Sequence, residues 1–225
     1  LGSINYSGTS QGAINAGTYV ISGTALSGLG YALSYADGEL TVHKANLTLS
    51  GTRVYDAGTT FAGQHLTATG VAGQTFSVTG SGDASNLTSK NVQSNQPLSS
   101  VTGLALGTSA NNGLADNYNA LSTTGSSVSV TRKALTVNAA AEDKTYDATR
   151  LATVNSINSA EIIGNDTVNI AYSSANFANK NVARDASGGI IGQSVTVSGL
   201  SLSGSDAGNY SIASETVTSA KITPK

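Results

Sequence analysis

The sequence repeats itself over a distance as long as a whole domain. The segment ANLTL at Ala45–Leu49 returns as KALTV at Lys133–Val137, 88 positions later. Further pairs of similar segments follow in the same order: Val54–Ala57 with Thr145–Ala148, Lys90–Val92 with Lys180–Val182, Val101–Leu106 with Val197–Leu202, and Asp116–Tyr118 with Gly208–Tyr210. A period of this length fits an array of small domains, because the coils of a solenoid repeat after far fewer residues.

The repeat predicts where the modules begin and end. The stretch before Ala45 ends like the stretch before Lys133, so a module is expected to end at each point. The predicted parts are an incomplete module at 1–44, complete modules at 45–132 and 133–220, and the start of a further repeat at 221–225. Neither joint contains Pro or Gly, whereas flexible linkers are longer and rich in Gly and Ser. We therefore expect stiff joints and an array that forms a rod.

Alternating apolar and polar residues predict a chain made almost entirely of β-strands. The predicted strands are Thr18–Ser22, Tyr31–Tyr35, Glu39–His43, Leu47–Leu49, Gln74–Thr79, Ser127–Thr131, Leu135–Val137, Val168–Tyr172, Ser194–Ser198 and Asn209–Ala213. Such alternation buries one face of each strand, which is typical of antiparallel sheets. The Ala-rich stretch Ala139–Glu142 is too short for a helix. We expect an all-β fold of tandem small antiparallel β-sandwiches with Ig-like architecture; a β-solenoid is the alternative.

Composition limits the partners of such an array. Only 11% of the residues are charged and the net charge is -2. The sequence therefore has no basic patch of the kind that binds nucleic acid, and no nucleic-acid partner is expected. No apolar run is long enough for a membrane helix, which argues against membrane insertion. Met and Cys are both absent. The lack of Met predicts a piece of a longer protein, and any export signal or anchor is then expected outside this piece.

Four short motifs together resemble a known family. They are a start of the LTV type, a Tyr-Asp pair after Arg53 or Lys144, a Lys-Asn-Val segment, and an Asn-Tyr pair near the end of the module. This set resembles the YDG-type repeats of large bacterial exported adhesins, such as filamentous-haemagglutinin-like and two-partner-secreted exoproteins. AGTY at Ala16–Tyr19 and YADGELTV at Tyr35–Val42 resemble the back half of the related MBG repeat. The resemblance implies a stalk outside the cell, either secreted or attached to the bacterial outer surface.

One position departs from the family pattern. The glycine of the family's Tyr-Asp-Gly is Ala57 in the first complete module and Ala148 in the second. If that glycine serves a left-handed turn, the turn here must differ or tolerate a Cβ atom.

The repeated polar motifs are predicted to be structural. They comprise Tyr55, Asp56, Tyr146, Asp147, Asn117, Tyr118, Asn209 and Tyr210. A Tyr-Asp pair could bind a ligand or a cation. A packed Tyr ring beside an Asp that caps a turn is the simpler interpretation, and its repetition in both modules favours it.

Few residues offer catalytic or metal chemistry. His43 and His65 are the only histidines, they lack zinc spacing, and no nucleophile motif accompanies them, so we expect neither an enzyme nor a cofactor. Calcium is the remaining metal hypothesis, and it rests on aspartates in Gly- and Asn-rich loops that lack the EF-hand pattern. These are Asp83, Asp116 and Asp206, together with Asp166 and Asp185. Lys90 and Lys180 are the first lysines to inspect for an isopeptide bond to an Asn.

The expected function is that of structural spacer repeats in an adhesin that supports cell adhesion or biofilm aggregation. Neighbouring repeats of the same chain are the expected partners. The alternative is a module that binds a glycan or a host or biofilm protein directly, or that self-associates through open sheet edges. The absence of Trp argues against a sugar platform without excluding binding at sheet edges.

Overall fold

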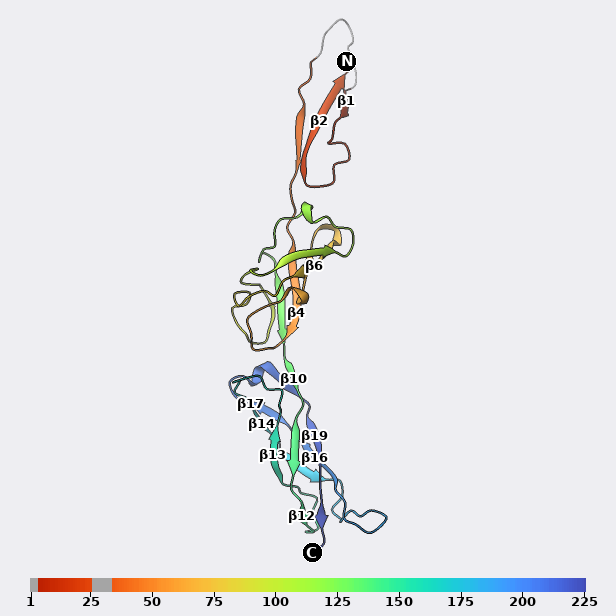
Figure 1. Ribbon diagram of the computed structural model, residues 1–225, viewed down its shortest axis with the longest axis vertical. Coiled ribbons are helices and arrows are strands. Elements are labelled where there is room, and N and C mark those ends of the chain that lie inside the picture. The colour runs from red at the N-terminus through yellow and green to blue at the C-terminus, as the bar shows by residue number, and fades with distance from the viewer. Residues whose placement is uncertain (1–3, 26–33) are drawn as a thin grey trace. The chain divides into compact units, whose positions relative to one another are not determined.

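The computed structural model describes residues 4–25 and 34–225, and these form an all-β structure (Figure 1). The helices in these ranges are short 3₁₀ turns: η1 (Gly63–His65), η2 (Val71–Gly73), η3 (Ala115–Asn117) and η4 (Ala207–Asn209). None of them is long or apolar enough to cross a membrane. Contacts divide the chain into unit 1 (Leu1–Thr52, Thr59–Thr88 and Asn95–Val128) and unit 2 (Arg53–Gly58, Ser89–Ser94 and Ser129–Lys225).

Unit 1 contains a three-stranded antiparallel sheet in the order β1-β2-β3. Its strands are β1 (Ile4–Ser7), β2 (Gly17–Ala25) and β3 (Gly38–Val42). The predicted strands Thr18–Ser22 and Glu39–His43 overlap β2 and β3. The predicted strand Tyr31–Tyr35 lies largely outside the described residues, and Ser34 and Tyr35 are not in a strand.

The larger sheet has six strands in the order β7-β9-β4-β5-β6-β8. Their bounds are β4 (Thr48–Val54), β5 (Leu66–Thr69), β6 (Thr75–Thr79), β7 (Gln93–Gln96), β8 (Ala105–Ser109) and β9 (Ser127–Thr131). Alternation buries one face of the strands: in β6, Phe76 and Val78 are buried while Ser77 between them is exposed. The boundaries between the two units fall inside β4, β7 and β9, so these strands contribute residues to both units.

A buried asparagine holds the loops beside this sheet. The Asn86 side chain is fully buried and accepts hydrogen bonds from the N–H groups of Phe61 and Asp83, at 3.2 and 2.7 Å. Its Nδ2 donates to the carbonyls of Ser100 and Thr102, each at 3.1 Å. These four bonds use both polar atoms of the buried amide side chain. They also fix the start of the segment that leads to Lys90.

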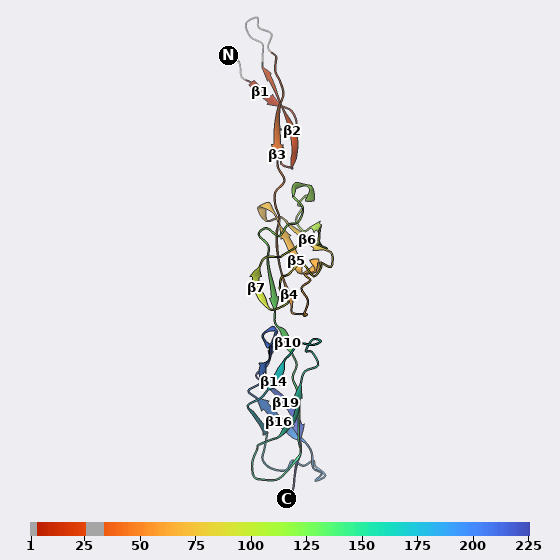
Figure 2. The same ribbon diagram turned by 90° about the vertical axis from the view of Figure 1, so that its left-hand side faces the viewer.

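Unit 2 consists of several small sheets. Its strands are β10 (Lys133–Leu135), β11 (Asn138–Ala141), β12 (Lys144–Thr145), β13 (Val154–Asn158), β14 (Asn169–Ala171), β15 (Ser174–Phe177), β16 (Gln193–Ser198), β17 (Ser201–Ser203), β18 (Tyr210–Ile212), β19 (Glu215–Ala220) and β20 (Ile222–Thr223). β15-β16-β19 form a three-stranded antiparallel sheet, and Figure 2 shows β16 beside β19. β11 pairs with β13 and β14 with β17 in antiparallel fashion, whereas β10–β18 and β12–β20 are parallel pairs.

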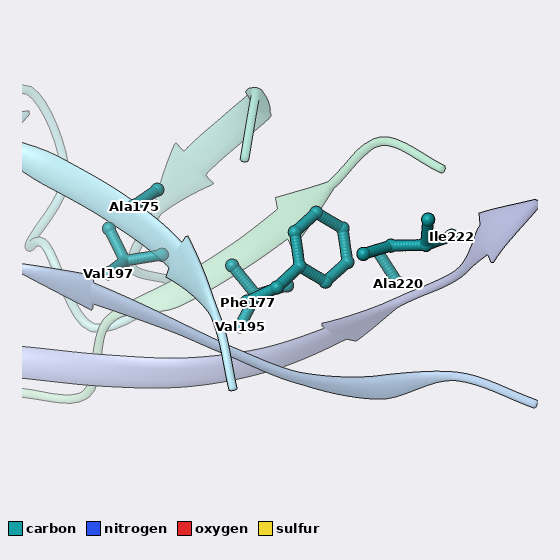
Figure 3. Packing of buried hydrophobic residues seen from close by; sticks show 6 residues of the cluster. All are labelled: Ala175, Phe177, Val195, Val197, Ala220 and Ile222. Carbon is teal, nitrogen blue, oxygen red and sulfur yellow. The ribbon is translucent and has the colours of Figure 1, made fainter. Parts of the chain in front are cut away.

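The core of unit 2 gathers around the ring of Phe177 (Figure 3). Phe177 lies opposite Val195 in the pairing of β15 with β16, and neither side chain is exposed. Ala220 and Ile222 close the other side of the ring in Figure 3. Partly buried residues of other strands pack on this cluster, among them Ala139, Val154 and Ile157. Burial of these apolar side chains is the main source of stability for unit 2.

The sequence-based expectation of an all-β chain is confirmed, while several details differ. The Ala-rich stretch is part of a strand, β11, because its alternate residues pack toward the core of unit 2. Ile222 was assigned by sequence to a further repeat, yet it is fully buried in this core. Most pairings are antiparallel as expected. The β-solenoid alternative predicts parallel coils, and the described strands form separate small sheets instead.

Candidate functional site

The same asparagine arrangement occurs in both units. In unit 2, Asn209 Oδ1 accepts a hydrogen bond from Val92 N–H at 2.9 Å, and Asn209 Nδ2 donates to Asn91 Oδ1 at 3.1 Å. In unit 1, Asn117 Oδ1 accepts from Ala16 N–H at 2.8 Å and Asn117 Nδ2 donates to Asn15 Oδ1 at 3.0 Å. We call this pair of bonds, from one Asn side chain to an Asn–X dipeptide, the asparagine clamp. It joins residues more than 100 positions apart in the sequence.

The tyrosine that follows each clamp asparagine is anchored in an equivalent way. Tyr210 OH accepts from Ile163 N–H at 3.0 Å and donates to Asp166 Oδ2 at 2.7 Å. Tyr118 OH accepts from Val71 N–H at 3.1 Å and donates to Gln74 Oε1 at 2.6 Å. Both rings are buried. Asp166 and Gln74 therefore occupy corresponding positions, each at the end of a turn closed by a 3.0 Å backbone bond.

In unit 2 this arrangement extends into a charged network. Asp166 Oδ2 also accepts a hydrogen bond from Tyr55 OH at 2.7 Å, and Asp166 Oδ1 forms an ion pair with Lys90 Nζ at 2.8 Å. Lys90 reaches Asp206 as well, at 3.1 Å. The rings of Tyr55 and Tyr210 meet edge to face with centroids 5.4 Å apart. The Asp166 side chain is only 5% exposed, so its two oxygens depend on these three donors.

The pKa shifts agree with this pattern of donors and acceptors. Burial by itself raises the pKa of Asp166, but the hydrogen bonds from Lys90, Tyr210 and Tyr55 outweigh burial and lower it. Burial, together with the bond to Asp166, raises the pKa of Tyr210 to about 12 and also raises the pKa of Tyr55. The bond to Asp166 raises the pKa of Lys90. At neutral pH Asp166 is therefore an ionised carboxylate that faces the ammonium group of Lys90 and two hydroxyl donors.

The first Tyr-Asp motif forms a left-handed turn next to this network. Asp56 Oδ1 accepts from Gly58 N–H at 2.9 Å and forms an ion pair with Arg53. Arg53 Nη2 donates to Gly58 O at 2.6 Å. Ala57, between them, has a φ of 64°, so the turn keeps its left-handed residue although the glycine is replaced by alanine.

The second Tyr-Asp motif repeats this turn within unit 2. Asp147 Oδ1 accepts from Thr149 N–H at 2.9 Å and from Lys144 Nζ at 2.9 Å, and Lys144 Nζ also donates to Thr149 O at 3.0 Å. Ala148 has a φ of 66°. The Lys144 bond, followed by the Thr149 N–H, lowers the pKa of Asp147 to about 2.

Replacing Ala148 with glycine is expected to stabilise unit 2 by about 0.5–1 kcal/mol, because glycine removes the Cβ penalty of a left-handed residue. Ala148 is exposed, so no packing is lost. Urea unfolding followed by circular dichroism measures the change. Ala171→Gly is the matched control: Ala171 is exposed in strand β14, where glycine should destabilise by about 0.5–1 kcal/mol. A loss of stability in Ala148→Gly would contradict the assigned turn.

The five calcium candidates do not form one group, and two of them, Asp166 and Asp206, lie on either side of a lysine. Asp83 bonds to Ser85 and Asp185 bonds to Ser187 and Gly189, which are turn contacts within their own loops. Asp116 is exposed. Asp166 and Asp206 share Lys90. Within the described part of the chain, no three His, Asp or Glu side chains are grouped so that they could hold a metal ion.

The other residues singled out by sequence fall in different places. Lys90 contacts two carboxylates, whereas an isopeptide bond of the kind considered requires an asparagine. Sequence reasoning did not identify Gln74, Ile163 or the special role of Asp166. Both repeats contain a short turn whose last residue carries a side-chain oxygen that accepts a hydrogen bond from a tyrosine hydroxyl. The sequence does not identify this turn, because the contact with the tyrosine is known only from the structure.

Residues 131–218 match the model of the YDG domain, so the chain contains a YDG domain. This match confirms the resemblance to YDG-type repeats for the second complete module. The matched residues include the second Tyr-Asp pair, the clamp residue Asn209 and the tyrosine that follows it, Tyr210. No curated protein and no solved structure matches the chain.

Proposed function

We propose that this chain, with its YDG domain at 131–218, is a spacer segment of a large bacterial adhesin that is secreted or attached to the outer surface. In this proposal the repeats are tandem antiparallel β-sandwich modules of Ig-like architecture that stack into a rod. The role is mechanical: the rod holds an adhesive part of the parent protein away from the cell and supports adhesion or biofilm aggregation. Catalysis has no part in it.

The asparagine clamp is the observation that carries this proposal. The same two hydrogen bonds join Asn117 to Asn15–Ala16 and Asn209 to Asn91–Val92. In each case the bonds join the end of one sequence repeat to a loop of the repeat before it. Directional bonds to backbone and side-chain amides fix one geometry, unlike a nonspecific apolar contact. A joint of this kind, used more than once, suits a spacer.

Sequence and composition also support a stiff array. Neither predicted joint contains Pro or Gly, whereas flexible linkers are longer and rich in Gly and Ser. The chain also carries few charges and no grouped metal-ligating side chains among its described residues. These features favour a structural role over a catalytic one.

Small-angle scattering at several concentrations tests the spacer proposal. We expect the pair-distance distribution of a thin rod, unchanged with concentration and unchanged by EDTA. A compact globule would contradict the proposal, because tandem modules that fold back on one another cannot act as a spacer.

Self-association through sheet edges is a second candidate function, and strand β1 favours it. β1 is an outer strand of its sheet and all four of its residues are exposed, including Ile4 and Tyr6 at 52% and 66%. Exposed edge strands with apolar side chains can pair with a second chain. In the same scattering series, particle growth with concentration would favour this function, and Tyr6→Lys should suppress the growth.

A further inference from the structure

We propose that Tyr146, Lys180, Asn181 and Val182 form a preformed acceptor site for another repeat of the same kind. Its occupant would be a repeat equivalent to residues 131–223, docking through its own Asn209, Tyr210, Asp166 and Asp206. This inference rests on the proposed spacer function and names the surface through which a further repeat is added.

The occupied version of this acceptor lies in the same chain. There, Asn91 and Val92 receive the clamp bonds from Asn209, Lys90 pairs with Asp166 and Asp206, and Tyr55 bonds to Asp166. The corresponding residues of the second repeat are Asn181, Val182, Lys180 and Tyr146. Each of the four acceptor positions thus keeps its residue type.

Three backbone features of the second acceptor match those of the first. Asn181 N–H donates to Asn179 Oδ1 at 3.0 Å, as Asn91 N–H donates to Ser89 Oγ at 3.1 Å. Tyr146 N–H donates to Thr223 O at 2.8 Å, as Tyr55 N–H donates to Thr131 O at 2.9 Å. The left-handed turns after the two tyrosines have φ values of 64° and 66°. Docking of a repeat would therefore cost little conformational entropy at this surface.

The second acceptor differs from the first in what covers it. Tyr55 is 1% exposed beneath Tyr210, whereas Tyr146 is only partly buried. Among the described residues, Lys180 has no ion pair and Val182 N–H has no hydrogen-bond acceptor. The first acceptor shows what supplies these partners: two carboxylates for the lysine, an amide oxygen for the backbone N–H, and a tyrosine ring for the tyrosine.

The correspondence of Thr131 with Thr223 fixes how a third repeat should be attached. We would extend the full chain by placing a second copy of residues 132–225 directly after Thr223. Covalent attachment gives a high effective concentration, so even a weak docking contact forms. Hydrogen exchange followed by mass spectrometry or NMR then compares the amide of Val182 with that of Val92 in the same molecule.

Addition of the third repeat should slow exchange at Val182 about tenfold, as expected when an amide that lacks an acceptor gains a stable hydrogen bond. Asn209→Ala in the added copy should abolish this slowing, because it removes both clamp bonds. Asn158→Ala in the added copy is the matched control: Asn158 is an exposed strand residue, and the slowing should remain.

Unchanged exchange at Val182, with Val92 still protected, would overturn the acceptor site and leave the spacer proposal standing. Slowing that persists in Asn209→Ala would also overturn it. So would an added copy that stays unfolded, judged by rapid exchange at its own Val195, because the acceptor should hold a folded repeat. A compact scattering profile of the unextended chain would instead count against the spacer proposal itself.

Discussion

Replacing Asp166 with alanine should lower the free energy of unfolding of unit 2 by about 2–4 kcal/mol, because it strips partners from buried donors. The hydroxyls of Tyr55 and Tyr210 both donate to this carboxylate at 2.7 Å, and Lys90 pairs with it at 2.8 Å. After the substitution Lys90 keeps only Asp206. Urea unfolding followed by tyrosine circular dichroism near 275 nm reports the loss, since the chain has no Trp.

The control for this prediction is Asp116→Ala. Asp116 is exposed, and its removal should change stability by less than about 0.5 kcal/mol. Asp166→Asn should fall between the two, because the amide oxygen can still accept a hydroxyl donor while the charge that Lys90 faces is gone. If Asp166→Ala and Asp116→Ala have the same free energy of unfolding, the network around Asp166 does not stabilise unit 2.

Truncating Phe177 to alanine should destabilise unit 2 by about 3–5 kcal/mol, because the change leaves a cavity in the centre of its core. The side chain is 0% exposed and packs between Val195 and the Ala220–Ile222 end of the cluster. Lys144 Nζ lies 5.4 Å from the ring centroid, so the ring also supports the residue that holds the second Tyr-Asp turn. Equilibrium unfolding in urea measures the loss.

Two further variants keep this prediction testable even if Phe177→Ala does not fold. Phe177→Leu introduces the residue found at the equivalent position of the first repeat, Leu87, and should cost only about 1–2 kcal/mol. Val217→Ala alters a side chain on strand β19 of the same sheet that is 60% exposed, and should cost less than about 0.5 kcal/mol. Equal losses in Phe177→Leu and Val217→Ala would place the core elsewhere.

Strands with strong alternation could be predicted from sequence, and weakly alternating strands could not. Gln74–Thr79 and Ser194–Ser198 contain β-branched or aromatic residues at every second position and correspond to β6 and β16. By contrast, β11 is mostly alanine and β7 is entirely polar, so neither carries a periodic signal. These segments form strands because they pair with other strands, and a local sequence pattern does not reveal the pairing partner.

The site could be predicted only in its parts. Repetition singled out the Lys-Asn-Val segment and the Asn-Tyr pair, but it gave no reason to bring Asn91 and Asn209 together across more than 100 residues. Asp166 was considered only as a calcium ligand. Its position is filled by Gln74 in the first repeat, and the two share an oxygen acceptor without sharing a charge. A search for identical residues therefore misses the correspondence.

The clamp and the network beside it give the repeats a specific contact made of directional hydrogen bonds. An amide pair, a buried carboxylate and two hydroxyls must all be satisfied at once, so a shifted arrangement would leave buried polar groups without partners. Such a contact selects one geometry more strongly than it adds stability. For a spacer, a fixed geometry that recurs along the chain is the useful property.

Small-angle scattering of the chain beside its Asn209→Ala variant tests the role of the clamp most directly. Our account predicts a thin rod for the unaltered chain, a broader distribution of maximum dimensions for Asn209→Ala, and no change for the exposed-site control Asn158→Ala. A compact profile for the unaltered chain, or identical profiles for Asn209→Ala and Asn158→Ala, would contradict the claim that the clamp makes these repeats a stiff spacer.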